Sequence, residues 1–127
     1  MKTGWSVPLD KLVEKTKLDL ETVARKTSLQ LFSSVINLSP VDTGRFRANW
    51  NVAYGTPDRS VGQFTDATRA QTEASKALTL ELGGVIYMTN SLPYAKRLEH
   101  GWSKQAPTGM VRKSALMFTR FVRKNSR

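Results

Sequence analysis

The triplet Asp42-Thr43-Gly44 is the first place in this sequence where residue types and order suggest chemistry. Asp-Thr-Gly carries the catalytic aspartate of aspartic proteases, in which two carboxylates meet across a symmetric dimer and share one proton. That arrangement needs an apolar strand before the aspartate, whereas Pro40 cannot donate to a strand ladder. Arg45 would favour ionising both carboxylates. We therefore interpret the triplet as a turn, in which Asp42 accepts backbone N–H groups and Gly44 supplies a positive φ.

Other catalytic or metal-binding groups are scarce. The chain has one histidine, His100, and no cysteine, so any Ser-His-Asp arrangement must pass through His100. The pattern places His100 at a helix end, where an exposed or capping histidine is ordinary. One histidine beside scattered carboxylates gives no metal-ligand spacing, and Gly83-Gly84 precedes a predicted strand, unlike a phosphate-binding loop. The sequence predicts no enzyme activity, no cofactor and no metal.

The composition is that of one folded domain with a strong positive charge. The 127 residues, 39% hydrophobic and 24% charged, are enough for one core and exclude a compositionally disordered chain. Without cysteine or a run of about 18 apolar residues, we expect a cytosolic protein with no membrane contact. The net charge of +10 is typical of proteins that work beside polyanions or acidic surfaces. After Gly84, nine cations and one acid leave +8 of that charge.

The elements that must position these groups begin with a long helix. From Pro8 to Leu38, apolar residues recur at intervals of three and four. Pro8 suits a first helical turn, and Pro40 pushes Ser39 out of the helical region, so we expect one helix over residues 8–38. At 1.5 Å per residue it would be about 45 Å long. Because so small a domain cannot cover it, we expect it to lie against a sheet or a neighbouring subunit.

Shorter elements follow the turn at residues 39–45. Alternating apolar residues, β-branched and aromatic composition, and the placement of proline and glycine locate them. The expected elements are a strand at Phe46–Tyr54, a weakly amphipathic helix from Thr65 or Asp66 to about Leu80, a strand at 85–90, and a two-turn helix at 93–101.

Residues 110–127 predict a helix with two faces. At about 100° per residue, its cations fall within an arc of about 120°, apolar residues occupy the other side, and Leu116 is the one misfit. No acid interrupts the cationic face, so it is either an ordinary solvated face or a surface that meets a polyanion or an acidic partner. The cations are Arg112, Lys113, Arg120, Arg123, Lys124 and Arg127.

Together these elements predict a single α+β domain spanning 1–127. Its long N-terminal helix packs on a small twisted, mostly antiparallel sheet, with short helices and a basic C-terminal helix. The expected parts are a flexible N-terminal arm at 1–7, the long helix at 8–38, a sheet-containing core at 39–109 and the basic helix at 110–127.

Several stretches taken together resemble a known family. The long helix is followed by SPVDTGRFRANW and later by IYMTNSLPYAKRLEHGWSKQAPTGMVR. These are similar to the neck or tail-completion proteins of long-tailed, siphovirus-type bacteriophages, which are also called head-tail joining or minor tail proteins. In that family a Pro-Val-Asp-Thr-Gly-Arg turn, an Asn, Pro-Tyr-Ala, Glu-x-Gly and Gln-Ala-Pro-x-Gly follow in order. The matching positions are Pro40–Arg45, Asn90, Pro93–Ala95, Glu99 with Gly101, and Gln105–Gly109.

The resemblance implies a structural virion protein of the neck, which completes the tail and joins it to the head. Such proteins form rings through which DNA passes, and we expect a hexamer. The implied partners are further copies of the chain, other neck, head-connector and tail-terminator proteins, and phage genomic DNA held non-specifically in the lumen. The protein would be present in the host cytoplasm during assembly and afterwards in the virion.

Two groups of residues become candidates for these contacts. Arg45, Arg47 and the cations of the C-terminal helix would face either DNA or neighbouring rings, because diffuse phosphate attraction suits a channel that must release its DNA. Tyr94, Trp102 and Met110 are candidates for docking surfaces in the assembled ring. The other interface or motif residues are Asp42, Gly44, Asn90, Glu99 and Gly101.

A different class of function stays open from the residues alone. The chain could be a free-standing nucleic-acid-binding protein whose basic C-terminal helix is its working surface. It has no helix-turn-helix or RNA-binding signature, so such binding would be directed at the phosphate backbone and would be non-specific.

Overall fold

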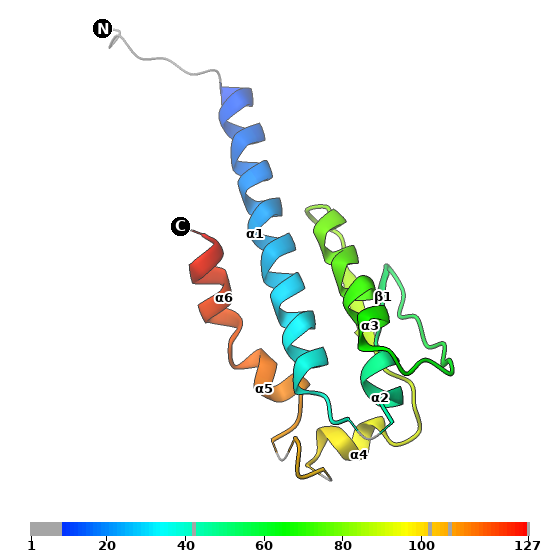
Figure 1. Ribbon diagram of the computed structural model, residues 1–127. Coiled ribbons are helices and arrows are strands. Elements are labelled where there is room, and N and C mark those ends of the chain that lie inside the picture. Colours follow the sequence, from blue (N-terminus) through cyan, green and yellow to red (C-terminus); the bar gives the residue numbers. More distant parts are fainter. Residues whose placement is uncertain (1–8, 42, 102, 107, 127) are drawn as a thin grey trace, which may run out of the picture.

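A single long helix organises the molecule. Figure 1 shows the computed structural model, which describes residues 9–41, 43–101, 103–106 and 108–126. Helix α1 (Leu9–Leu38) runs along the molecule, and the other elements lie around the C-terminal part of this helix. This confirms the predicted α+β class, with a long N-terminal helix, a small antiparallel sheet and several short helices. The predicted flexible arm at 1–7 lies outside the described residues.

The remaining elements are short, and two of them form the sheet. β1 and β2 pair antiparallel, with Val52 opposite Met88 and Ala53 opposite Tyr87. In the described part of the chain, no helix is both long enough and apolar enough to cross a membrane. In chain order the elements after α1 are α2 (Arg45–Ala48), β1 (Asn51–Tyr54), α3 (Ala67–Ala74), the 3₁₀ helix η1 (Ser75–Thr79), β2 (Ile86–Thr89), α4 (Ala95–Glu99), α5 (Val111–Ala115) and α6 (Phe118–Asn125).

The predicted strand over Phe46–Tyr54 is wrong in its first half, where the helical turn α2 lies, and correct in its second half, β1. Phe46 and Trp50 are both buried and four residues apart, a spacing that fits a helical turn as well as an alternating strand. Gly44, with φ of 87°, leads the chain into α2. The Asn49 side chain then donates to the carbonyl of the first residue of α2, at 2.7 Å. These local bonds favour the helical alternative.

The predicted single helix over residues 110–127 is in fact two helices, α5 and α6, which are separated at Leu116 and Met117. The N–H of Met117 donates to the carbonyl of Ser114, a tighter step than an α-helix makes. Neither proline nor glycine occurs at this break. Each of the two pieces packs on α1.

Each of the two helices has its own polar contact with α1. The hydroxyl of Ser114 in α5 lies 2.8 Å from that of Ser34. In α6, the Asn125 side chain donates to Gln30 at 2.7 Å and to Thr27 at 3.4 Å. The break therefore allows both helices to follow the same side of α1.

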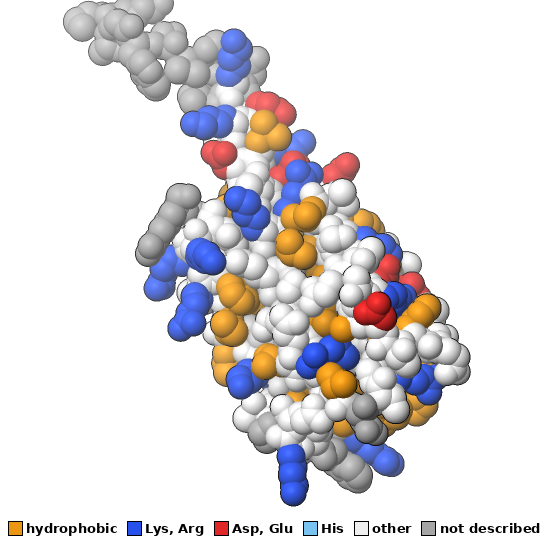
Figure 2. Space-filling view, viewed as in Figure 1, with side chains coloured by type: hydrophobic (Ala, Val, Ile, Leu, Met, Phe, Trp, Pro, Cys, Tyr) orange, Lys and Arg blue, Asp and Glu red, His pale blue; other side chains and the backbone are white. Residues whose placement is uncertain are grey.

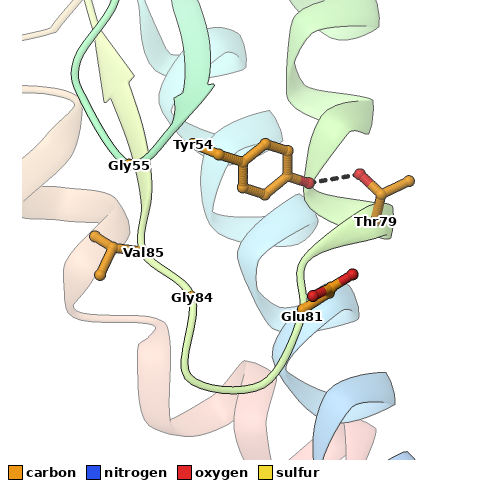
Figure 3. A pocket seen from close by; sticks show the side chains of 6 residues that line it. All are labelled: Tyr54, Gly55, Thr79, Glu81, Gly84 and Val85. Atoms are coloured by element: carbon orange, nitrogen blue, oxygen red, sulfur yellow. Dashed lines mark hydrogen bonds between the residues drawn. The ribbon is translucent and has the colours of Figure 1, made fainter.

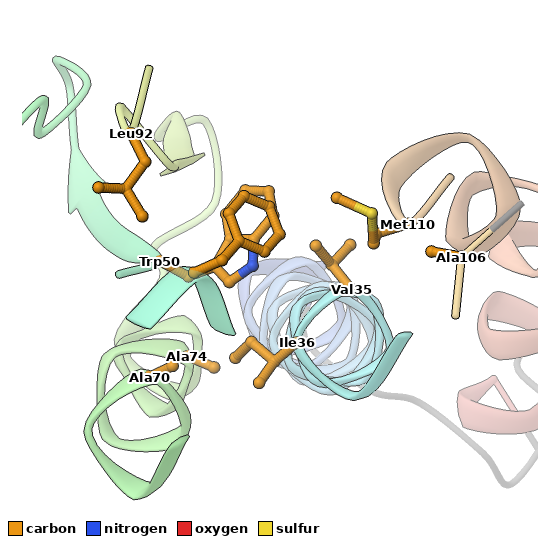
Figure 4. Close-up of a cluster of buried hydrophobic side chains, with 9 residues drawn as sticks. Val35, Ile36, Trp50, Ala70, Ala74, Leu92, Ala106 and Met110 are labelled. Carbon is orange, nitrogen blue, oxygen red and sulfur yellow. The ribbon is translucent and has the colours of Figure 1, made fainter. Parts of the chain in front are cut away.

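The hydrophobic core forms where α1 meets the sheet and the short helices. Figure 4 shows Ile36 and Ala74 directed toward one another, and Trp50 placed over Val35. Ala70 and Ala74 are fully buried, and their small side chains let α3 approach α1 closely. The core cluster consists of Val35, Ile36, Phe46, Trp50, Ala70, Ala74, Leu92, Ala106 and Met110.

The N-terminal part of α1 extends beyond this core. Before Glu21, every side chain that the structure describes on α1 is exposed. Leu18 and Leu20 are 53% and 51% exposed. Figure 1 shows this stretch projecting from the body of the molecule. The expectation that the domain cannot cover its own long helix is therefore met.

Candidate interaction surfaces

Side-chain hydrogen bonds join motif residues that are far apart in the sequence. The Gln105 side chain donates to the carbonyl of Val41 and accepts the N–H of Val41, both at 2.8 Å. The Asn90 side chain donates to the carbonyl of Phe46 at 2.8 Å. The turn after α1, the segment after β2 and the loop after α4 thus meet at one end of the molecule.

Glu99 fixes the start of α5. One of its carboxylate oxygens accepts the N–H groups of Met110 and Val111, at 2.9 and 2.8 Å. The other accepts the N–H and the Nε of Arg112, at 3.0 and 3.1 Å. Burial acts to raise the pKa of Glu99, but these donors outweigh it and the pKa is lowered. A Cβ at Gly109 would lie 2.6 Å from this carboxylate, so glycine is required there.

A hollow of about 320 Å³ opens beside these contacts. Tyr94, which is 38% exposed, lines this hollow, and its ring centroid lies 6.1 Å from that of Phe46. Tyr94 is therefore placed where a docking partner could reach it. Trp102 lies outside the described residues. The hollow is lined by Pro40, Val41, Thr43, Phe46, Tyr94, Leu98, Ser103 and Gln105.

The expected docking role of Met110 needs correction, because its side chain is only 1% exposed and belongs to the core. Its backbone N–H is held by Glu99 at the start of α5. The sequence of the loop alone does not reveal that this side chain is buried. Met110 is therefore a core residue and not part of a docking surface.

Two of the candidate arginines already have partners in their own chain. Arg47 donates from both Nε and a terminal nitrogen to the carbonyl of Ser39, and from that nitrogen to Asn37 as well. It thereby satisfies carbonyls at the C-terminal end of α1. Arg112 pairs with Glu99 and donates to its carbonyl at 2.6 Å. Arg45 differs, since its Nε is buried with no hydrogen-bond partner among the described residues.

The cations that remain available lie on α5 and α6. Lys113, Arg120, Arg123 and Lys124 are exposed, and none forms an ion pair within the described residues. Figure 2 shows blue side chains gathered over the edge formed by α6, with the red ones over α1 and the α3 side. This set of four cations is the cationic surface. Arg127 and Asp42 lie outside the described residues.

The glycines of the motifs serve the backbone. Gly44 has φ of 87°, as expected for the turn, and a Cβ there would lie 2.5 Å from the carbonyl oxygen of Thr65. Gly101 has φ of 88° and follows α4, where the sequence predicts the helix to close. Both positions use a conformation that other residues rarely adopt.

A second hollow, of about 360 Å³, lies beside the turn before β2 (Figure 3). It offers one carboxylate, Glu81, and the hydroxyl of Tyr54. That hydroxyl is already bonded to Thr79 at 2.6 Å and to the carbonyl of Lys76. The described residues also contain no group of three or more His, Asp or Glu side chains that could hold a metal ion. The other hydroxyl that lines this hollow, that of Thr79, donates to the carbonyl of Lys76 at 2.9 Å.

Sequence reasoning missed the role of Arg69. Its guanidinium donates to the carbonyls of Ala48 and Trp50, at 3.0 and 2.9 Å, and to the side chain of Asn51. These bonds connect α3 to the start of β1. An arginine in a weakly amphipathic helix looks like any solvated cation, so no signal in the sequence distinguishes it.

No family model matches the chain, and no curated protein or solved structure matches it.

Proposed function

We propose that this chain is a structural protein of the bacteriophage neck, which completes the tail and joins it to the head as part of a ring around the passing DNA. The observation that carries this proposal is the direct bonding among the motif residues. Gln105 holds Val41, and Glu99 holds the start of α5. Because these motif residues bond to one another, they form one structural unit, and this supports the proposal.

The exposed part of α1 supports assembly from several copies. Its leucines Leu18 and Leu20 are half exposed in the described chain. The charges beside them are mixed, with Lys15 and Lys17 near Glu14 and Asp19. A mixed-charge surface with exposed leucines suits a protein partner better than DNA. We expect a hexameric ring in which one face of each subunit meets a different face of the next.

The cationic surface supports the second half of the proposal. Lys113, Arg120, Arg123 and Lys124 have no acid beside them in α5 or α6, so their field is not neutralised locally. Such a surface attracts phosphates without reading bases, and salt weakens the attraction. It suits either the DNA in the lumen or acidic surfaces of the adjoining head-connector and tail-terminator proteins. The chain would act in the virion after assembly in the host cytoplasm, and it would have no catalytic role.

The decisive experiment compares the oligomeric state of the purified chain with its state in particles. Mass measurement in solution and electron microscopy of the neck should show a ring of this chain in the particle, whether or not the free chain is a monomer. Particles whose neck lacks the chain would overturn the proposal.

The cationic surface also favours a second candidate function, a free-standing protein that binds nucleic acid non-specifically. Arg120, Arg123 and Lys124 can be changed together to Glu to separate the two. The neck proposal expects particle assembly to suffer. If assembly stays intact while DNA binding in solution is abolished, nucleic-acid binding is the better account.

A further inference from the structure

The two-stranded sheet has one closed edge and one open edge. On the outer edge of β1, the N–H of Val52 donates to the Glu73 carboxylate at 3.1 Å, and the carbonyl of Val52 accepts from Lys76 at 3.0 Å. Side chains from α3 and η1 therefore occupy the backbone groups that another strand would need. No strand can add to the sheet on this side without displacing them.

β2 has no such cover on its outer edge. The backbone N–H and carbonyl of Val52 point away from β2. The bonds between the strands are therefore made by Asn51 and Ala53, whose partners on β2 are Thr89 and Tyr87. The backbone groups of Ile86 and Met88 then point outward. A bond from the N–H of Gly55 to the carbonyl of Val85, at 2.9 Å, agrees with this alternation. Among the described residues, nothing bonds to these outward groups of Ile86 and Met88.

A second unpaired edge lies in the segment between β1 and α3. The carbonyls of Asp58 and Ser60 accept from the Asn51 side chain at 3.3 and 2.8 Å. Gly62 exchanges two bonds with the Asn49 side chain, at 2.9 and 3.2 Å. The carbonyls of Asp58 and Ser60 and both backbone groups of Gly62 thus turn toward their own fold, while the N–H of Ser60 donates to the Asp58 carboxylate at 3.0 Å.

The odd-numbered residues of the same segment turn theirs away. The structure assigns no hydrogen-bond partner, within the described chain, to the backbone groups of Arg59, Val61 and Gln63. The segment has no helix or strand of its own, and the side chain of Val61 is 45% exposed. Residues 59–63 therefore carry unpaired donors and acceptors at the surface, as the outer edge of β2 does.

We propose that these two edges pair between copies, so that residues 59–63 of one copy add as a strand to the β2 edge of the next. Extended segments add to open strand edges through main-chain bonds. The contact joins unlike surfaces, so repetition of it gives a ring or a helix of subunits. The proposal rests on the proposed ring and identifies one of its interfaces.

An apolar groove beside the β2 edge fits this occupant. It has a volume of about 260 Å³, and Met88 is part of its lining together with Trp50 and Val111. A strand added at Met88 would lay one of its side chains over the groove, and Val61 is the exposed apolar side chain of the segment. None of the described groove-lining residues is charged, so the apolar side chain of Val61 meets no charged group there.

The absence of native cysteine allows a direct test by disulfide cross-linking. One preparation carries Val61→Cys, and a second, tagged preparation carries a cysteine at Ile86, Tyr87 or Met88 in turn. Opposed residues in an antiparallel pair have Cα atoms about 4.5–5.5 Å apart, within the range that a disulfide spans. Lys124→Cys, on α6, is the control in the second preparation. Both are mixed and oxidised mildly at the highest soluble concentration, and the mixed dimer is measured by mass.

We expect one β2 position to give a mixed dimer in clear excess over the Lys124 control. Equal yields at all positions would overturn the interface. Ring formation is scored separately by electron microscopy, so the two proposals can fail independently. Rings without the selective cross-link would reject this interface alone, and the cross-link without rings would reject the ring alone.

A backbone variant tests the same contact without cysteine. Val61→Pro removes an N–H that makes no bond inside the chain, whereas Val61→Thr keeps it. Loss of one backbone hydrogen bond should weaken association about tenfold in Val61→Pro relative to Val61→Thr. The melting temperature verifies folding, and Gln63→Pro replaces the first variant if that temperature falls. Equal association of the proline and threonine variants contradicts the proposal.

Discussion

Glu99 shows how one residue affects both the fold and the surface. It is the single acid after Gly84. Its carboxylate accepts hydrogen bonds within the chain, from the N–H groups of Met110, Val111 and Arg112. Because Glu99 neutralises only Arg112 among the nearby cations, the cationic surface keeps its charge. Glu99 therefore fixes the first residues of α5, and it does not neutralise the cations of α6.

Glu99→Gln should lower the free energy of unfolding by about 2 kcal/mol, because a charged acceptor of several hydrogen bonds becomes neutral. Chemical denaturation measures the change. Glu14→Gln is the control, since Glu14 is exposed on the projecting part of α1 and should alter stability little. Equal stability of the two variants would show that the carboxylate does not hold α5.

The pH dependence of that difference follows from the lowered pKa of Glu99. A carboxyl whose pKa is lower in the folded state adds stability that is fully present above the unfolded value of about 4.3. The stability is lost as the pH falls through the lower, folded value. The advantage of the native chain over Glu99→Gln should be constant near neutrality and shrink in this acid range, as measured by denaturation at several pH values. A difference that grows on acidification would contradict it.

Gly44 and Gly83 separate backbone strain from steric contact, because both have φ of 87°. A Cβ at Gly83 meets nothing within 4 Å, whereas at Gly44 it would lie 2.5 Å from the Thr65 carbonyl oxygen. Gly83→Ala should cost about 1–2 kcal/mol of stability for the left-handed conformation alone. Gly44→Ala should cost about 1–3 kcal/mol more for the overlap. Thermal unfolding of both variants measures the difference, and equal losses would exclude the contact with Thr65.

At the scale of elements, the division of residues 110–127 into α5 and α6 decides how the cations are presented. A continuous helix would carry them on one arc, whereas the break at Leu116 gives each part its own direction. Leu116 is 86% exposed and Phe118 50% exposed, so apolar side chains lie among the cations. The surface therefore offers both charge and apolar area to a partner.

Neutralising α6 should weaken DNA binding more than neutralising α1 does. We predict that Arg120→Gln, Arg123→Gln and Lys124→Gln together reduce the salt dependence of binding, with a slope smaller by up to about 2.7 if each contacts one phosphate. The matched control removes the same number of charges from exposed α1, by Lys11→Gln, Lys15→Gln and Lys17→Gln. Binding to duplex DNA at several salt concentrations gives both slopes. Identical slopes would mean that only net charge matters.

At the scale of the whole molecule, α1 is longer than the body that packs on it. Glu21 is 8% exposed and accepts the N–H of Leu82 at 3.2 Å, so the covered part of the helix begins there. Leu18 and Leu20 lie just beyond that point. The molecule is a compact body with a helical extension, a shape that suits insertion between neighbours.

Changing Leu18 and Leu20 together to Ser should leave the melting temperature nearly unchanged but weaken self-association. The two side chains are half exposed in the single chain, so the substitutions remove little buried apolar area from the fold. A neighbouring copy would cover the exposed half. Leu92→Ser is the contrasting variant, because Leu92 is 3% exposed and its loss should destabilise the fold by several kcal/mol, roughly 2–5. Mass measurement and thermal unfolding test both. Unchanged association would exclude this part of α1 from the interface.

The sequence by itself determined the features that depend on local periodicity and on special residues. α1 ends at Leu38, shortly before Pro40, Asp66 caps α3, and Gly44 takes the positive φ expected of the turn. These follow from steric and hydrogen-bonding rules that act within a few residues. They were sufficient to predict the α+β class and the strand of β2.

Only the tertiary structure decided which of two local alternatives prevails and which polar groups meet. Phe46 and Trp50 satisfy both a strand and a helical turn, and burial against α1 together with the Asn49 bond selects the turn. The break before α6 is marked by neither proline nor glycine, and α5 and α6 each make their own polar contact with α1. Likewise, the packing of the chain determines that Glu99 accepts the N–H of Met110. Such a pairing has no periodic pattern in the sequence from which it could be predicted.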